Sequence, residues 1–155
     1  MRQATLLLIK PDAMRRGVWL DVERMVKTSG LTIMLKQSYE PNAPRELIES
    51  HYREHVGRSY FEDLVNFMVS GPIIALRIEG EDAIHRLRVL IGDKDFTKAA
   101  AGTIRRELGF AGATPQETVV HGSDSPESAE HELSIWFEKD WNENPLAEQL
   151  RTGHG

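Results

Sequence analysis

The order of apolar runs in this sequence predicts an α+β fold built on one antiparallel sheet of four strands. Four short runs are typical of strands, and longer runs with helical spacing separate the first from the second and the third from the fourth. Two shorter helical runs stand between the second and the third. Without this pair and the last helix the order is βαββαβ, the ferredoxin-like arrangement, with helices on one face of the sheet. We expect the pair to form an inserted helical hairpin that overhangs one edge and supplies one wall of a cleft.

The first half of the chain contains two expected strands and three expected helices. A nearly continuous apolar run stops at Pro11, as in a buried strand, and the helical run that follows ends at Gly30. The next run alternates apolar and polar residues up to Tyr39, which is typical of a strand. Two shorter helical runs separated by Gly57 predict the hairpin. The expected ranges are strand 4–10, helix 16–29, strand 31–39 and helices 45–56 and 60–68.

The second half repeats the strand and helix pattern and adds a last helix. Gly71 and Pro72 open an apolar run, and an acidic run then starts an amphipathic helix. The segment Ser125-Pro126-Glu127 is typical of a helix start: serine caps, proline fits the first position, and glutamate suits the positive end. The expected ranges are strand 73–78, helix 79–91, a helical turn at 103–107, a strand that ends at residue 121, and a helix from residue 125.

Length and composition are those of one ordinary globular domain. The chain has 155 residues, 40% hydrophobic and 28% charged, with a formal net charge of −5, which argues against broad binding to nucleic acid or anionic membranes. It has no cysteine, which excludes disulfides, thiol catalysis and cysteine-ligated zinc. The apolar run at 6–9 is too short to span a bilayer and lacks signal-peptide flanks, so we expect a cytoplasmic protein. We expect one domain over 1–138 and a polar C-terminal tail over 139–155.

The stretch around His121 is a candidate for chemistry. His121 ends an expected strand beside a helix start, whose free N–H groups attract anions. A side chain that titrates near neutrality beside such an anion site is a candidate nucleophile for phosphoryl transfer. Glu132 lies at the edge of the apolar helix stripe, where a carboxylate needs a partner such as an imidazole. The alternative is a strand-end histidine and a solvent-bonded glutamate. The expected stripe is Ala129, Leu133, Trp136 and Phe137.

Three cations break apolar patterns in ways that suit a polyanionic ligand. Lys10 ends an apolar strand, Arg88 interrupts a helix stripe, and Arg105 follows a loop bounded by glycines. Phosphoryl transfer needs charge neutralisation and positioning, which such groups provide. The alternative for each is a snorkelling lysine or an arginine paired with a carboxylate. Tyr60 is placed to stack on a base or, alternatively, to pack with its hydroxyl in water. A glycine-rich loop of the Walker type is missing.

The histidines raise the question of a metal site. His51 and His55 are spaced to share one helix face, as paired ligands would be. An acidic residue at the matching helix position is missing, so we interpret the pair as surface or hairpin-packing residues. We therefore expect no dedicated metal site.

Six segments carry a resemblance to a known family. They are Lys10-Pro11-Asp12, His51-Tyr52, Ser70-Gly71-Pro72, Gly102-Thr103-Ile104-Arg105, His121-Gly122-Ser123-Asp124-Ser125, and the run from Ser128 to Phe137. In order and spacing, from about residue 4 to residue 137, they resemble the nucleoside diphosphate kinase family. The His-Gly-Ser-Asp-Ser block is highly specific to it.

The resemblance implies an activity and a set of site residues. The family moves the γ-phosphate of a nucleoside triphosphate, typically ATP, to a nucleoside diphosphate in a ping-pong reaction through a phosphohistidine. Mg²⁺ travels with the nucleotide phosphates. The resemblance makes His121 the nucleophile, with Glu132 orienting its imidazole and Ser123 assisting. It also implies that Lys10, Arg88 and Arg105 bind the phosphates and that Lys10 meets the sugar hydroxyl. Tyr52 would lie near the histidine, and the base would stack on Tyr60.

The chain departs from the family pattern near the expected nucleotide site. Lys94 stands where the family usually has a phosphate-binding threonine, and Asp95-Phe96 replaces Asn-Pro. Thr118 replaces an asparagine that binds the sugar, and the segment 108–117 is about three residues longer than usual. These changes bear on affinity and turnover more than on reaction type, and we count Lys94 and Thr118 as substrate-binding residues.

Three hypotheses follow. The first is an active nucleoside diphosphate kinase, and the second is a nucleotide-binding regulatory relative with weak or no turnover. The third is a nucleic-acid-binding module, since RNA-binding domains also use the ferredoxin-like fold; apolar strands and the negative charge weigh against it. The resemblance also implies nucleoside di- and triphosphates as ligands and a homo-oligomer built from dimers, either a tetramer or a hexamer, with no membrane partner.

Overall fold

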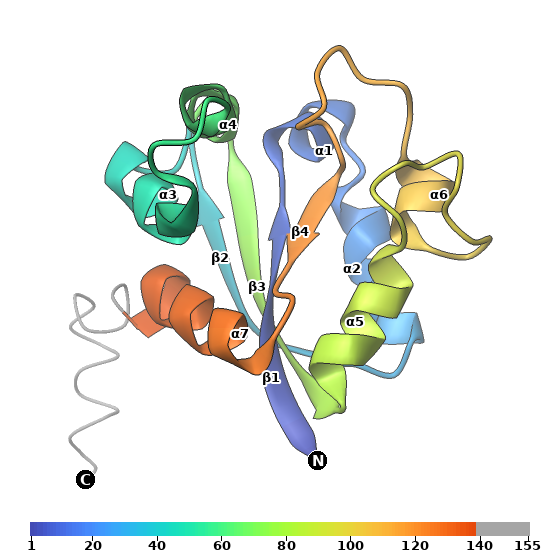
Figure 1. Cartoon of the computed structure of the whole chain (residues 1–155). Helices are drawn as coiled ribbons and strands as arrows, with labels where there is room; N and C mark the ends of the chain where they lie inside the picture. Colours follow the sequence, from blue (N-terminus) through green and yellow to red (C-terminus); the bar gives the residue numbers. More distant parts are fainter. Residues whose placement is uncertain (139–155) are drawn as a thin grey trace, which may run out of the picture.

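One antiparallel sheet organises the protein. The computed structural model describes residues 1–138, in which four strands follow the order β2-β3-β1-β4, and every neighbouring pair is antiparallel (Figure 1). This confirms the expected ferredoxin-like order. The expected tail, 139–155, lies outside the described residues. The strands are β1 (Arg2–Ile9), β2 (Thr32–Tyr39), β3 (Ile73–Glu81) and β4 (Val120–Gly122).

Seven α-helices connect or cover the strands of the described part. Among residues 1–138, none of them combines the length and apolar content needed to cross a lipid bilayer. A 3-10 turn (Arg53–His55) follows α3, and a π-helical turn (Ser134–Glu138) follows α7. The helices are α1 (Pro11–Arg16), α2 (Trp19–Thr28), α3 (Arg45–His51), α4 (Phe61–Met68), α5 (Ala83–Ile91), α6 (Ile104–Leu108) and α7 (Pro126–Leu133).

Two expected helices begin or divide differently in the structure. The helix expected over 16–29 begins only at Trp19, because a separate helix that was not predicted, α1, starts at Pro11 and Gly17, with φ +71°, ends it in the left-handed conformation. The helix expected from residue 79 begins at Ala83. Strand β3 continues to Glu81 because β1 begins at Arg2 and pairs with it there. The end of a strand thus depended on its partner rather than on its own sequence.

Helices cover both faces of the sheet, and our prediction of one covered face was wrong. Along β1, Leu7 and Ile9 point to a core shared with α2 and α5, whereas Leu6 and Leu8 point to a second core. That second core is closed by α3, α4 and α7, which lie on the other side of the sheet (Figure 1). The helical hairpin and the last helix, which the βαββαβ count leaves out, therefore provide the second layer. No open sheet face of the RNA-binding kind exists among the described strands.

The last helix has the cap and the buried stripe that its sequence predicts. The Ser125 hydroxyl accepts a hydrogen bond from the backbone N–H of Ser128, and Pro126 occupies the first position. All four expected stripe residues are buried. Trp136 is fully enclosed, and its indole N–H donates to Nδ1 of His51 at 3.0 Å. These contacts fix α7 against the sheet and against α3.

The two-sided sheet makes a prediction about stability. Replacing Leu7 or Leu8 by alanine should each lower the free energy of unfolding by about 2–5 kcal/mol, because each side chain is fully buried in a different core. Chemical denaturation measures both values. Val89→Ala, at a mostly exposed position on α5, is the control and should change stability by less than about 0.5 kcal/mol. A small effect at Leu8 alone would contradict a closed second face.

Candidate active site

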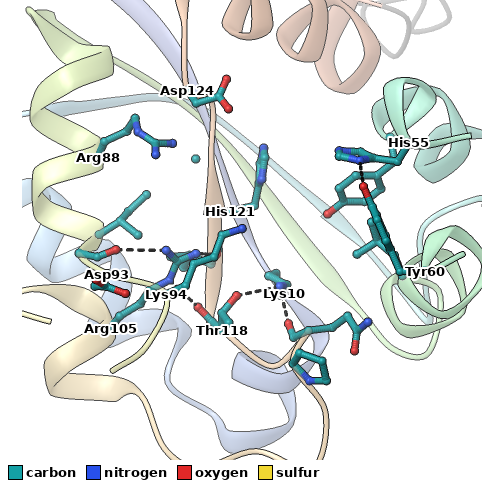
Figure 2. A pocket seen from close by; sticks show the side chains of 18 residues that line it. Lys10, His55, Tyr60, Arg88, Asp93, Lys94, Arg105, Thr118, His121 and Asp124 are labelled. Carbon is teal, nitrogen blue, oxygen red and sulfur yellow. Dashed lines mark hydrogen bonds between the residues drawn. The ribbon is translucent and has the colours of Figure 1, made fainter. Parts of the chain in front are cut away.

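A cavity of about 660 Å³ opens between the helical hairpin and the α5–α6 side of the molecule. Figure 2 shows His121 near its centre, with Arg88, Lys94 and Arg105 on one side and His55 and Tyr60 on the other. The cavity collects residues that are far apart in the sequence, from the end of β1 to the start of α7. It brings together all the predicted substrate-binding residues and His121: Lys10, Tyr52, Tyr60, Arg88, Lys94, Arg105, Thr118 and His121.

The imidazole of His121 is held by a buried carboxylate that does not line the cavity. Its Nε2 lies 2.9 Å from Oε1 of Glu132, and the hydroxyl of Ser123 donates to the same oxygen at 2.7 Å. Both Glu132 and Ser123 are buried, whereas the His121 side chain is 25% exposed. An acceptor at Nε2 favours the tautomer with its proton there, which leaves the Nδ1 lone pair available. This is the arrangement of an activated nucleophile with an orienting group.

His51 is part of this cluster, and our interpretation of it as a surface or hairpin-packing residue missed the contact. Its ring is buried, and its centroid lies 4.6 Å from that of His121. Burial, and then the positive charge that His121 can carry, hold the pKa of His51 well below its usual value. His51 therefore stays neutral. The signal was present in the sequence, because residue 51 continues the buried α3 stripe of Leu47 and Ile48.

The same cluster contains residue types that bind metal ions. Among residues 1–138, His51, His121 and Glu132 form a group whose ligand atoms lie within 4.8 Å of one another. However, Nδ1 of His51 accepts the Trp136 indole N–H, so its proton sits on Nε2 and that nitrogen has no lone pair for a metal. His121 and Glu132 are better described as a hydrogen-bonded pair against which the ring of His51 packs. His55 does not join it, because its Nδ1 lies 2.6 Å from the Tyr60 hydroxyl.

Lys10 is a buried cation at the floor of the cavity. Its ammonium donates to the hydroxyl of Thr118 at 3.0 Å and to the carbonyl of Gln116. Burial is the main cause that lowers the pKa of Lys10 to about 8; the positive charges of Arg105 and Lys94 add to this lowering, and the negative charges of Asp12 and Glu117 partly oppose it. An anion bound beside Lys10 would raise its pKa again, because a nearby negative charge favours the protonated, positively charged ammonium.

Arg105 has a structural task that the sequence did not indicate. Its guanidinium donates to three backbone carbonyls, at 3.0 Å to Thr118, 3.1 Å to Gly92 and 2.8 Å to Val120. Of its five N–H groups, two remain for a ligand. Burial, with the neighbouring positive charge of Arg88, lowers the pKa of Arg105 to about 10. Arg88 and Lys94 are exposed at the cavity wall, and they are better placed to move toward an anion.

The opposite wall is aromatic. Tyr60 is 44% exposed, and its hydroxyl is bound to His55, which fixes the plane of the phenol ring. Tyr52 is buried with its ring centroid 6.4 Å from that of His121. Burial, and then the charge of Glu132, raise the pKa of Tyr52 far above its usual value, so its hydroxyl stays neutral. The sequence predicted Tyr60 as a stacking surface but gave no sign of its bond to His55.

The approach to β4 contains backbone strain. Val119 has φ +72°, and the amide of Val120 donates to the carbonyl of Thr118 at 2.8 Å, which makes a γ-turn of the positive-φ type. Such a conformation costs about 1–3 kcal/mol in a β-branched residue. The Val119 amide donates to Oδ2 of buried Asp12 at 2.9 Å. Asp12 belongs to one of the segments singled out in the sequence, but no role was predicted for it.

Comparison with known proteins points in one direction. The family model described as nucleoside diphosphate kinase matches residues 3–141. A nucleoside diphosphate kinase of Staphylococcus aureus (strain JH9) is 39% identical over 93% of this chain and 91% of its own length. Among solved structures, the Halobacterium salinarum enzyme in complex with CDP has a TM-score of 0.81 and 33% identity, covering 90% of both chains. The Aquifex aeolicus enzyme has a TM-score of 0.79 and 35% identity, covering 88% of this chain and 96% of that one.

Burial and the neighbouring positive charges predict the pH at which Lys10 loses its proton. In NMR spectra of the lysine side chains, Lys10 should titrate with a midpoint near pH 8. Lys94→Thr should raise that midpoint, because one positive charge that opposes protonation is gone. Lys98→Thr is the control, since Lys98 lies 4.0 Å from Asp95 rather than in the cavity, and it should leave the midpoint unchanged. A midpoint above pH 10 in the wild-type chain would contradict the burial of this charge.

Proposed function

Because the chain belongs to the nucleoside diphosphate kinase family and is a phosphotransferase of nucleotides, we propose that it works in a ping-pong reaction through a phosphohistidine at His121. The γ-phosphate of a nucleoside triphosphate, typically ATP, moves to His121 and then to a nucleoside diphosphate. The observation that carries this proposal is the bond from Nε2 of His121 to Glu132 inside a cavity lined with cations.

The two half-reactions follow from the free lone pair on Nδ1. In the first, Nδ1 attacks the γ-phosphorus, the bond to the bridging oxygen breaks, and the nucleoside diphosphate leaves with the electron pair. In the second, a terminal oxygen of the acceptor diphosphate attacks phosphorus, and the phosphorus–nitrogen bond breaks. Glu132 stabilises the positive charge on the ring while the Nε2 proton stays in place. Ser123 holds the carboxylate in the orientation that this requires.

The remaining predicted residues bind and orient the nucleotide. Arg88 and Lys94 at the wall and Lys10 at the floor neutralise the phosphates, and Arg105 adds its two spare N–H groups. Lys10 and Thr118, which already contact each other, are placed together for the sugar hydroxyl.

Tyr60 presents a flat face to the base, and stacking of this kind tolerates many bases. Tyr52 packs behind the nucleophile and excludes water from it.

Mg²⁺ accompanies the nucleotide in this proposal rather than occupying a protein site. It prefers oxygen ligands, and the exposed carboxylates of Asp93 and Asp124 line the cavity, whereas the histidine cluster offers nitrogen. The nucleotide phosphates would hold the ion, and either carboxylate would accept hydrogen bonds from its water molecules. When bound, Mg²⁺ neutralises charge on the transferring phosphoryl group.

A second candidate is a nucleotide-binding regulatory relative with weak or no turnover. Lys94 and Thr118 favour it, because Thr118 is shorter than the usual asparagine and an extra lysine holds phosphate more strongly. The assembly is also a proposal: a homo-oligomer built from dimers, tetramer or hexamer. The exposed edge strand β2, with Met34 and Leu35 on its surface, supports it. A cytoplasmic location and one domain over 1–138 complete the proposal.

The nucleophile has a direct test. Incubation with γ-labelled ATP and Mg²⁺ should give a protein-bound label that is stable in base, labile in acid, and transferred to added GDP. His121→Gln should lose the label completely. His131→Gln is the matched control, because His131 lies on α7 and its Nε2 is 3.3 Å from the Ser50 carbonyl, outside the main cavity. No label on folded wild-type protein would favour the regulatory relative.

The orienting role of Glu132 has a separate test. Glu132→Gln should slow formation of the phosphoenzyme by about tenfold or more, because the amide cannot stabilise a positive ring. Binding of ADP, measured by calorimetry, should change by less than about threefold, since Glu132 lies behind the ring rather than in the main cavity. Equal losses in binding and in rate would contradict an orienting role.

A further inference from the structure

A buried carboxylate holds the turn that leads into β4, two residues before His121. The amide of Val119 donates to Oδ2 of Asp12 at 2.9 Å, and the carbonyl of Val119 accepts from the amide of Lys10 at 3.0 Å. Both groups come from the junction of β1 and α1, far from Val119 in the sequence. A valine with φ +72° keeps that conformation only when its surroundings hold it, and these two bonds do so.

This role in holding the turn explains why a carboxylate is buried at residue 12. Asp12 is 1% exposed, and its second oxygen, Oδ1, has no hydrogen-bond partner within residues 1–138. A carboxylate in such a place is costly unless its bonds do something that the fold requires. Among residues 1–138, the hydrogen bond that its side chain accepts comes from the strained residue, Val119.

The turn decides where His121 sits. It brings the Thr118 carbonyl to the amide of Val120 and to the guanidinium of Arg105, and Val120 then begins the three-residue strand β4. Only Val120 separates the turn from His121. A change of backbone at Val119 would therefore reach the imidazole with little structure between to absorb it.

We propose that Asp12 is a positioning residue for phosphoryl transfer, acting through the γ-turn at Val119 to aim His121 into the cavity. This proposal rests on the proposed role of His121 as nucleophile. Asp12 does not line the cavity, so it acts without touching the nucleotide.

Asp12 is also a negative charge near Lys10, and one substitution separates the two roles. Asp12→Asn removes the charge but keeps an oxygen that accepts from the Val119 amide. Asp12→Ala removes both. Asp12→Leu keeps the branched shape of the side chain without an acceptor, and serves if the alanine variant does not fold.

The measurement is the single-turnover rate of phosphoenzyme formation at saturating ATP and Mg²⁺. Asp12→Ala should lower it by about tenfold or more, because a small misplacement of a nucleophile has a large effect on rate. Asp12→Asn should stay within about threefold of the wild type, since positioning needs the acceptor and not the charge. If the rate falls equally in Asp12→Ala and Asp12→Asn, the effect belongs to the charge of Asp12 and the proposal is overturned. A wild-type rate in Asp12→Ala would also overturn it.

A second substitution tests the turn itself. Glycine adopts positive φ without strain, so Val119→Gly in the Asp12→Ala background should recover most of the lost rate. Asp82→Gly is the matched control, because Asp82 also has a positive φ of 52° but lies at the start of α5, outside the cavity. It should recover nothing. Equal recovery by both glycines, or by neither, would overturn the role of the turn.

NMR spectra of the protein without nucleotide test the positioning role of Asp12 independently of the proposed function. In NMR spectra, Asp12→Ala should increase hydrogen exchange at the Val119 amide and shift the ring resonances of His121, and Val119→Gly should reverse the ring shift. If the wild type forms no phosphohistidine, the proposed function fails and these spectra still decide the positioning role. Unchanged His121 resonances in Asp12→Ala would end it.

Discussion

The position of His121 depends on a strand of three residues. Strand β4 pairs with β1 only from Val120 to Gly122, with His121 opposite Leu8. Three residue pairs are few to fix the position of a nucleophile, so contacts from neighbouring elements add further restraint. Arg105 donates to the carbonyls on both sides of Val119, and Gly122 lets α5 approach so closely that a Cβ there would lie 2.5 Å from Ile91 Cδ1. The imidazole thus sits on backbone clamped by side chains.

The electrostatics of the cavity favour a polyanion over an empty site. Lys10 and Arg105 are buried near each other and near Arg88 and Lys94, and burial lowers the pKa of both. Folding has placed positive charges where water solvates them poorly. A chain of phosphates compensates several of these charges at once, whereas a single phosphate compensates fewer. The neutral His51 and Tyr52 behind His121 avoid adding charge where the ring itself becomes positive.

Local pattern predicted the parts of this structure that local physics determines. The apolar run of β1, the Ser125 cap and the stripe through Trp136 depend on residues close in sequence, and all three are present. The covering of the second sheet face was missed because it depends on where the hairpin and α7 pack. The hydrogen bonds of Arg105 to backbone carbonyls and of Asp12 to Val119 join residues that are not neighbours in the sequence, so no periodic pattern predicts them. Backbone strain at a valine leaves no trace in composition.

The site divides into parts that can change at different rates in evolution. His121 and Glu132 come from β4 and α7, which pack on the buried sheet, where substitution of a buried side chain is costly to stability. Lys94 and the segment 108–117 come from exposed connections between elements. A lineage can therefore alter which nucleotides it holds, and how tightly, while the nucleophile and its carboxylate stay the same. Of the differences of this chain from its family, Lys94 and the longer segment 108–117 lie in such exposed connections, whereas Thr118 lies in the turn that precedes His121.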